Sequence, residues 1–124
     1  MLRSKMDVQN DAQVPSTSKT PVISATGDAQ AVYLELYQQS VRFQNLLGQN
    51  DDANVTVYLP NVTEAKGLTF SFVLFDQDGD ADFIVADNDE SLDWGGDYTL
   101  DAEDDCLTLR SDGMSWVVVE NDIA

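Results

Sequence analysis

From residue 28 onward, hydrophobic and polar residues alternate in short runs. The run "AVYLELYQQ" alternates over residues 31–39, and "SVRFQNLL" repeats the same period over residues 40–47. A period of 2 places successive side chains on opposite faces, which is the pattern of a half-buried β-strand. Because Leu, Gln and Glu also favour helices, a single helix over residues 29–47 is the alternative interpretation.

The rest of the chain continues this pattern. Further strands are predicted in "NVTVYLP", which ends at Pro60, and in "LTFSFVLF", "ADFIVAD", "DYTLD", "CLTLRS" and "SWVVVE". Asp112-Gly113 lies between the last two runs, and glycine tolerates the positive φ that a tight hairpin turn requires. Short strands separated by turn residues predict an all-β fold, a small antiparallel β-sandwich or barrel.

The first 27 residues differ from the rest in both pattern and charge. They show no sustained period of 2 or 3.6, and they contain Pro15 and Pro21. They contain three basic residues, Arg3, Lys5 and Lys19, and only two acidic ones, whereas the other 21 acidic residues lie after residue 20. We therefore predict an extended arm over residues 1–27 and an antiparallel β domain over residues 28–124.

Composition excludes several classes of function. A net charge of −17 makes nucleic acid and anionic membranes poor partners. No apolar run approaches the length of a membrane-spanning helix. The chain has no histidine and a single cysteine, Cys106, so an internal disulfide, a zinc site and a histidine base are all ruled out. The sequence thus offers no positive sign of catalysis, and we predict a protein that is not an enzyme.

The stretch "DQDGDADFIVADNDE" is the strongest candidate for a metal site. Asp76, Asp78, Asp80 and Asp82 fill the first four ligand positions of an EF-type calcium loop. However, the position that requires glycine is Ala81, and the flanking segments are predicted strands rather than helices. A looser calcium site in a β-loop stays open as an alternative. The favoured interpretation is a solvated acidic loop, and no cofactor is predicted.

Residues 59–120 resemble a β module that recurs in structural proteins of tailed bacteriophages, in tail fibres and in head-decoration or head-fibre proteins. In that module a strand ending in Leu-Pro precedes a glycine and an apolar strand, and a Ser-Asp-Gly-x-x-Trp hairpin closes the unit. The matching residues here are Leu59, Pro60, Gly67, 98–100, 107–109, Ser111, Asp112, Gly113 and Trp116. The loops at 76–82 and 86–91 are more acidic than is usual for the module, so no shared ligand follows.

The resemblance implies a non-enzymatic component of the virion, commonly a trimer. A short chain with one arm and one domain is typical of a capsid decoration (cement) protein that binds the major capsid protein on the capsid surface. The arm residues expected to contact the capsid are Leu2, Arg3, Lys5, Val14, Pro15, Lys19, Pro21, Val22 and Ile23.

Three further interpretations remain open. The first is a head-fibre or tail-fibre tip that binds a host glycan through Trp94, Tyr98 and the acidic loops, with calcium as a bridging ion. The second is a free calcium-binding module, and an enzyme is the last. Trp116 is predicted to be buried, because buried packing is the commoner place for tryptophan in a small β domain. Cys106 is predicted to be a small core or interface residue.

Overall fold

The computed structural model describes residues 21–46, 53–88, 91, 92, 94 and 96–123. These residues form β-strands and no helix, which confirms the all-β prediction. The strands are β1 (Val22–Ser24), β2 (Gln30–Tyr33), β3 (Ser40–Asn45), β4 (Val55–Tyr58), β5 (Thr69–Gln77), β6 (Phe83–Ala86), β7 (Tyr98–Leu100), β8 (Cys106–Ser111) and β9 (Trp116–Asp122). The alternative helix over 29–47 is wrong, because two strands occupy the described part of that range.

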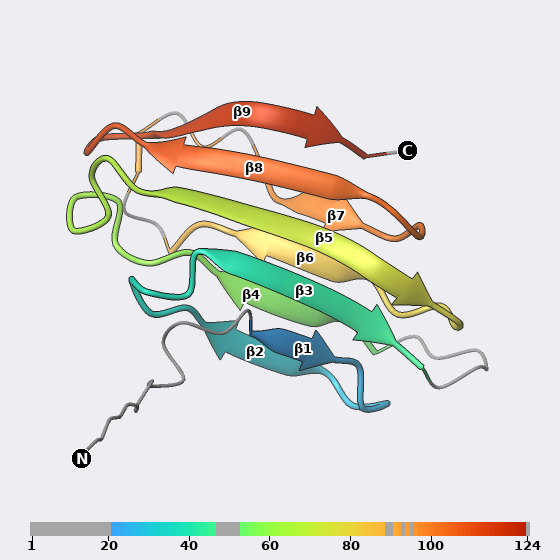
Figure 1. Ribbon diagram of the computed structural model, residues 1–124. Helices are drawn as coiled ribbons and strands as arrows, with labels where there is room; N and C mark the ends of the chain where they lie inside the picture. The colour runs from blue at the N-terminus through green and yellow to red at the C-terminus, as the bar shows by residue number, and fades with distance from the viewer. Residues whose placement is uncertain (1–20, 47–52, 89–90, 93, 95, 124) are drawn as a thin grey trace, which may run out of the picture.

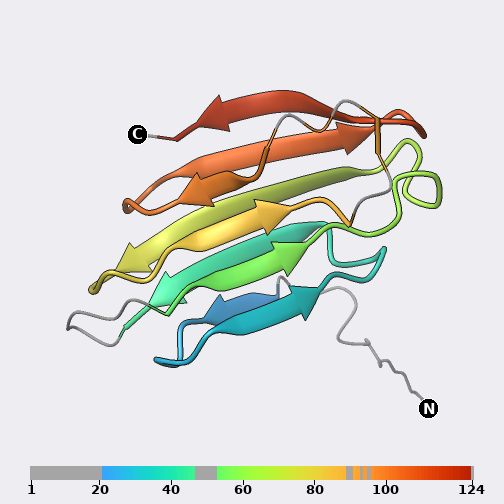
Figure 2. The same cartoon turned by 180° about the vertical axis from the view of Figure 1, so that it is seen from behind.

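The strands form two sheets that lie face to face (Figures 1 and 2). Sheet 1 has the order β1-β3-β5-β8-β9, and sheet 2 has the order β2-β4-β6-β7. The two layers form a sandwich-like fold and do not close into a barrel. Each sheet therefore has free edges, β1 and β9 in sheet 1 and β2 and β7 in sheet 2.

The sandwich was predicted to be antiparallel, and that part of the prediction is wrong, because both sheets are mixed. β1, β3 and β5 pair in parallel, as do β2, β4 and β6, while β8, β9 and β7 add antiparallel pairs. Parallel neighbours need a long crossover, which in most proteins is a helix. Here the chain crosses to the other sheet after each of its first five strands, so each crossover between parallel neighbours contains a strand of the opposite layer.

The first strand lies inside the range predicted as the arm. β1 pairs with β3, with Val22 opposite Arg42 and Ile23 opposite Phe43. The backbone stays hydrogen-bonded to β3 one residue beyond the end of β1, because the Ala25 amide donates to the Gln44 carbonyl at 3.0 Å. The sheet thus begins by Val22, and the predicted boundary at residue 27 falls after the first strand.

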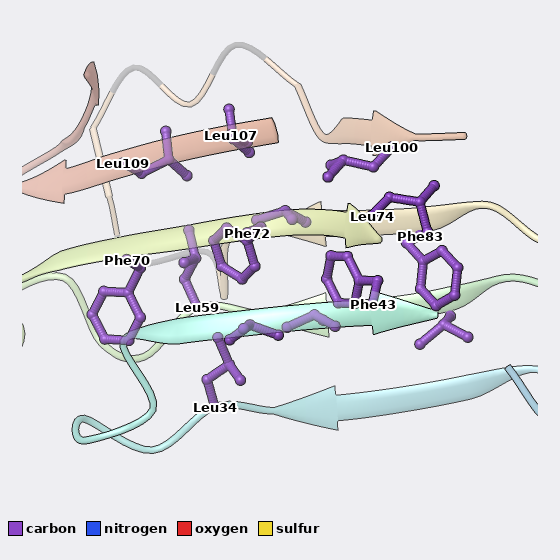
Figure 3. Packing of buried hydrophobic residues seen from close by; sticks show 14 of the residues in the cluster. Leu34, Phe43, Leu59, Phe70, Phe72, Leu74, Phe83, Leu100, Leu107 and Leu109 are labelled. Carbon is purple, nitrogen blue, oxygen red and sulfur yellow. The ribbon is translucent and has the colours of Figure 1, made fainter. Parts of the chain in front are cut away.

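The core fills the space between the two sheets, as the alternation predicts. Phe43 of sheet 1 stacks on Phe83 of sheet 2 with ring centroids 4.8 Å apart, and on Phe72 at 5.8 Å (Figure 3). All three rings are buried, together with Val55 and Val57 of β4. Burying a side chain of this size stabilises the fold by about 1.5–3 kcal/mol. The aromatic contact between the sheets therefore makes a large contribution to holding the layers together.

Individual strands match their predicted faces closely. Val41 and Phe43 point inward and Arg42 outward, as expected for the run over 40–47. The run over 31–39 forms a shorter strand than predicted, since β2 ends at Tyr33 and Leu36 lies exposed in a turn.

Candidate interaction surfaces

Strand direction gives the sandwich two unlike ends. β1, β3, β5 and β9 run in the same direction. The loops 25–29, 78–82 and 101–105, which connect the two sheets, lie at the end of the sandwich toward which these four strands run. The loops 34–39, 59–68 and 112–115 lie at the opposite end, and both views show this separation (Figures 1 and 2). We name the first the acidic end and the second the arm end, for the reasons below.

Most of the described carboxylates lie at the acidic end. They come from its three loops and from the last residues of β5 and β9: Asp28, Asp76, Asp78, Asp80, Asp82, Asp101, Glu103, Asp104, Asp105, Glu120 and Asp122. The described residues of these loops contain no lysine or arginine. Like charges held this close repel one another, and mobile ions screen that repulsion.

The repulsion acts on individual groups at this end. Burial raises the pKa of Asp82, and the negative charges of Asp101 and Asp80 raise it further. Burial likewise raises the pKa of the Cys106 thiol, and the negative charges of Glu120 and Asp122 raise it further. Cys106 is partly buried and faces outward, because its neighbour Leu107 points into the core. Of the two predicted positions, core or interface, the core is therefore wrong, and an interface position stays a prediction.

Side-chain amides close the loop that resembles a calcium site. The Gln77 Nε2 donates to the Ala81 carbonyl at 2.7 Å, and the Asn45 Nδ2 donates to the Gln77 Oε1 at 2.7 Å. Asp78 and Asp80 are exposed, while Asp76 and Asp82 are half-buried. Among the described residues, no group of three or more Asp, Glu or Cys side chains is arranged to hold a metal ion.

The arm joins the domain at the other end. The carbonyl of Pro21, just before β1, accepts a hydrogen bond of 3.0 Å from the amide of Arg42. Exposed apolar side chains gather in the loops of this end, among them Leu36, Tyr37 and Met114. Leu92, also exposed, is fixed beside the hairpin because its amide donates to the Met114 carbonyl at 2.8 Å. The arm end is thus the more apolar of the two.

The Ser-Asp-Gly motif builds the hairpin of the arm end. The Asp112 Oδ1 accepts hydrogen bonds from the amides of Met114 at 2.8 Å and Ser115 at 2.7 Å, and these bonds lower the pKa of this exposed carboxyl. Gly113 has a φ of 95°, and a side chain there would lie 3.0 Å from the Lys66 Cδ. Asp112 and Gly113 therefore have structural roles that account for their residue types.

The rest of the motif packs into the core. Trp116 is buried, as predicted, and its ring meets Phe70 edge-on at 5.6 Å. Leu59 is buried, and its amide donates to the Ala86 carbonyl at 2.9 Å. Pro60 follows Leu59 and lies half-buried where the chain leaves sheet 2.

The outer face of sheet 2 carries no charged side chain along its strands. Ala31, Thr56, Ile84 and Thr99 form one row across β2, β4, β6 and β7, and Tyr33 and Tyr58 begin the next row. The alternate residues Val55, Val57, Phe83 and Val85 are buried, so these rows face outward. We name Ala31, Tyr33, Thr56, Tyr58, Ile84 and Thr99 the neutral face.

Trp94 and Tyr98, the predicted glycan contacts, do come together. Their rings meet edge-on at 5.5 Å, and the Trp94 Nε1 donates to the Asp97 Oδ1 at 3.0 Å. Both rings are half-buried and pack against the hydrophobic core. This arrangement uses apolar surface of both rings for packing, so they do not form a flat exposed platform.

Of the predicted capsid-binding residues, only those next to β1 are described. Val22 is exposed on the outer face of sheet 1, whereas Ile23 points inward and packs against the core. Pro21 precedes the strand. Leu2, Arg3, Lys5, Val14, Pro15 and Lys19 lie outside the described residues.

Two features were not predicted from the sequence, namely the neutral face and the exposed valines of β9. Val117, Val118 and Val119 are 48%, 41% and 59% exposed on the free edge of sheet 1. The neutral face had a signal in the sequence, because Thr56 and Tyr58 alternate with buried valines, but only strand pairing brings its residues together.

No family model, curated protein or solved structure matches this chain. Within the described residues, no helix has the length and apolar character needed to cross a membrane.

Proposed function

We propose that this protein is a non-enzymatic capsid decoration (cement) protein of a tailed bacteriophage. It binds the major capsid protein on the surface of the mature capsid as a homotrimer. The observation that carries the proposal is the separation of the two ends: the arm enters at Pro21, opposite the end of the sandwich where most of the described carboxylates lie. A protein built this way can rest one end on the shell and expose the other.

The residues behind the phage resemblance support this proposal because they form one connected unit. The amide of Gly67 donates to the Ser111 carbonyl at 2.9 Å, and the Ser111 hydroxyl donates to the Val62 carbonyl, two residues beyond Pro60. The host-glycan alternative receives less support, because Trp94 and Tyr98 pack against the core.

Binding by mass action explains how such a protein stabilises a shell. A protein that binds only the mature lattice adds its own binding free energy to that state. The arm, with Arg3, Lys5 and Lys19, carries half of the six lysine and arginine residues of the chain but only two of its 23 acidic residues. The acidic end faces outward and keeps neighbouring particles apart by repulsion.

Capsid binding tests the proposal directly. Purified capsids lacking this protein would be mixed with the full chain, and co-sedimentation and capsid melting temperature would be measured. We expect the full chain to bind mature capsids and to raise their melting temperature. A variant lacking residues 1–20, and one with Arg3, Lys5 and Lys19 all changed to Glu, should lose binding while keeping the domain fold.

A matched control changes the other end. The double variant Asp78→Asn and Asp80→Asn removes exposed charge from the acidic end and should bind capsids as the full chain does. Failure of the full chain to bind mature capsids would contradict the proposed function. Equal binding by the chain lacking residues 1–20 would show that the arm is not the anchor.

A further inference from the structure

We propose that the copies of the trimer meet through the neutral face, Ala31, Tyr33, Thr56, Tyr58, Ile84 and Thr99, around a three-fold axis that runs along the strands. This inference rests on the proposed function, because it assumes that all arms point to one side, toward the shell. The occupant of the neutral face is thus a second copy of this chain.

The direction of the strands limits the geometry of such a trimer. Each arm joins its domain at the arm end. If three arms point the same way, the three-fold axis is roughly parallel to the strands, and contact occurs through a side of the sandwich rather than an end. The candidate sides are the outer faces of the two sheets and the two flanks formed by their edge strands.

Charge selects among these sides. At a cyclic axis each residue approaches its own copies, so a carboxylate on that side meets other carboxylates. The chain has a net charge of −17, and like charges placed opposite one another in an interface oppose association strongly. A side without charged residues is therefore favoured at the axis; the flank formed by β1 and β2 also has no charged side chain along its strands, and it adjoins the neutral face at Tyr33.

Sheet 1 offers a less suitable outer face. Its central row runs through Val22, Arg42, Val73, Cys106 and Asp122. The guanidinium of Arg42 lies 4.1 Å from the centre of the Phe75 ring, so charge sits in the middle of this face. Three copies facing one another here would bring their arginines together.

The β9 flank is apolar for only part of its length. Its exposed valines at 117–119 are followed by Glu120, Asn121 and Asp122. Burial raises the pKa of the neighbouring Cys106 thiol, and the negative charges of these two carboxylates raise it further. Copies arranged with parallel axes would align these acids with one another, and repulsion would oppose the contact.

The neutral face has the composition of an interface centre with a polar rim. Tyr33 lies on the edge strand β2 and is 61% exposed. One side of its ring stacks on Tyr58 with centroids 4.7 Å apart, which leaves the other side open on the free edge of the sheet. In the part of sheet 2 and its loops that the structure describes, carboxylates lie beyond the strand ends, with Asp82 and Asp101 at the acidic end and Glu35 and Asp97 at the arm end.

Charge insertion on the full chain tests the contact. Sedimentation velocity over a range of protein concentrations should give a trimer for the unchanged chain, strengthened by salt because the rim carboxylates are then screened. Thr56→Glu and Tyr33→Glu, made separately, should each weaken association at least tenfold. The matched controls Ser71→Glu, on the outer face of sheet 1, and Val117→Glu, on β9, should leave association unchanged.

Circular dichroism would confirm that all four variants fold. A monomer at every concentration, or dissociation by Val117→Glu with Thr56→Glu unaffected, would overturn this inference. Failure here is distinct from failure of the proposed function, because capsid co-sedimentation is measured separately. If the chain binds capsids but stays monomeric, only the neutral-face contact is contradicted. If it forms a neutral-face trimer that does not bind capsids, only the decoration function is contradicted.

Discussion

The hydroxyl of Ser111 donates a hydrogen bond of 2.6 Å to the carbonyl of Val62, 49 positions earlier in the chain. Ser111 is fully buried, and its Oγ also accepts a bond of 3.0 Å from the amide of Gly113. One hydroxyl thus fixes the β8–β9 hairpin to the loop between β4 and β5. The backbone of Ser111 strengthens this link through bonds with Gly67 and Leu68.

Replacing Ser111 with alanine should destabilise the domain by about 1–3 kcal/mol, because the Val62 carbonyl and the Gly113 amide then lose a buried partner. Urea unfolding followed by tryptophan fluorescence would measure the loss. Ser115→Ala is the matched control, since that hydroxyl makes only a 3.4 Å contact with Asp112, and it should change stability by less than about 0.5 kcal/mol. Equal stability of the two variants would contradict the role given to Ser111.

Gly113→Ala should also destabilise the hairpin, for two separable reasons. A φ of 95° is costly for alanine, and the new methyl group would lie 3.0 Å from the Lys66 side chain. We expect a loss of about 1–3 kcal/mol in urea unfolding. In a Lys66→Ala background the contact is gone, so any remaining loss measures the backbone cost alone. If the loss disappears entirely in that background, the positive φ is not the cause.

Alternation of apolar and polar residues predicted the faces of the strands correctly. Val41 and Phe43 were placed inward, and Asp112-Gly113 was placed at a hairpin bend, because both features depend on a few consecutive residues. The buried position of Trp116 followed from its size and its place on a strand. Local rules sufficed for these features.

Pairing and register depended on contacts distant in the chain. The parallel pairing of β3 with β5 could not be read from alternation, because the signal is identical for either direction. β1 was missed because Val22–Ser24 is only three residues long and follows a proline. The neutral face required the register that aligns Thr56 with Ile84, and no single strand contains that information.

Asp104 is the one described non-glycine residue with a positive φ, 73°, in the loop between β7 and β8. Asp104→Gly should stabilise the domain by up to about 1 kcal/mol, because glycine adopts this conformation without steric cost. Asp104→Asn is the control, since it removes the same charge and keeps the side chain. If both variants gain equally in thermal melting, relief of charge repulsion rather than backbone strain is the cause.

Asp82→Asn should raise the melting temperature at neutral pH. Burial and the charges of Asp101 and Asp80 raise the pKa of Asp82 above its value in the unfolded chain, so the folded state binds the proton more tightly. The carboxylate therefore lowers stability above its folded pKa, and that penalty disappears as pH falls below its unfolded value of 3.8. The gain of the variant should accordingly vanish in acid. Asp28→Asn removes one charge from the same end and is the matched control; equal profiles of melting temperature against pH for the two variants would contradict this assignment.

Calcium should stabilise the protein only as a screening ion. The loop 78–82 is closed by the amides of Gln77 and Asn45, and its exposed carboxylates Asp78 and Asp80 gain from any cation that reduces their repulsion. Melting temperature would be measured in CaCl₂ and MgCl₂ at equal ionic strength, with NaCl as the monovalent reference. We expect the two divalent salts to give the same upward shift, because a solvated acidic surface does not select for ion size. The Asp78→Asn, Asp80→Asn double variant should reduce both shifts equally. A larger shift with calcium than with magnesium, lost in that variant, would instead establish a calcium site in this loop.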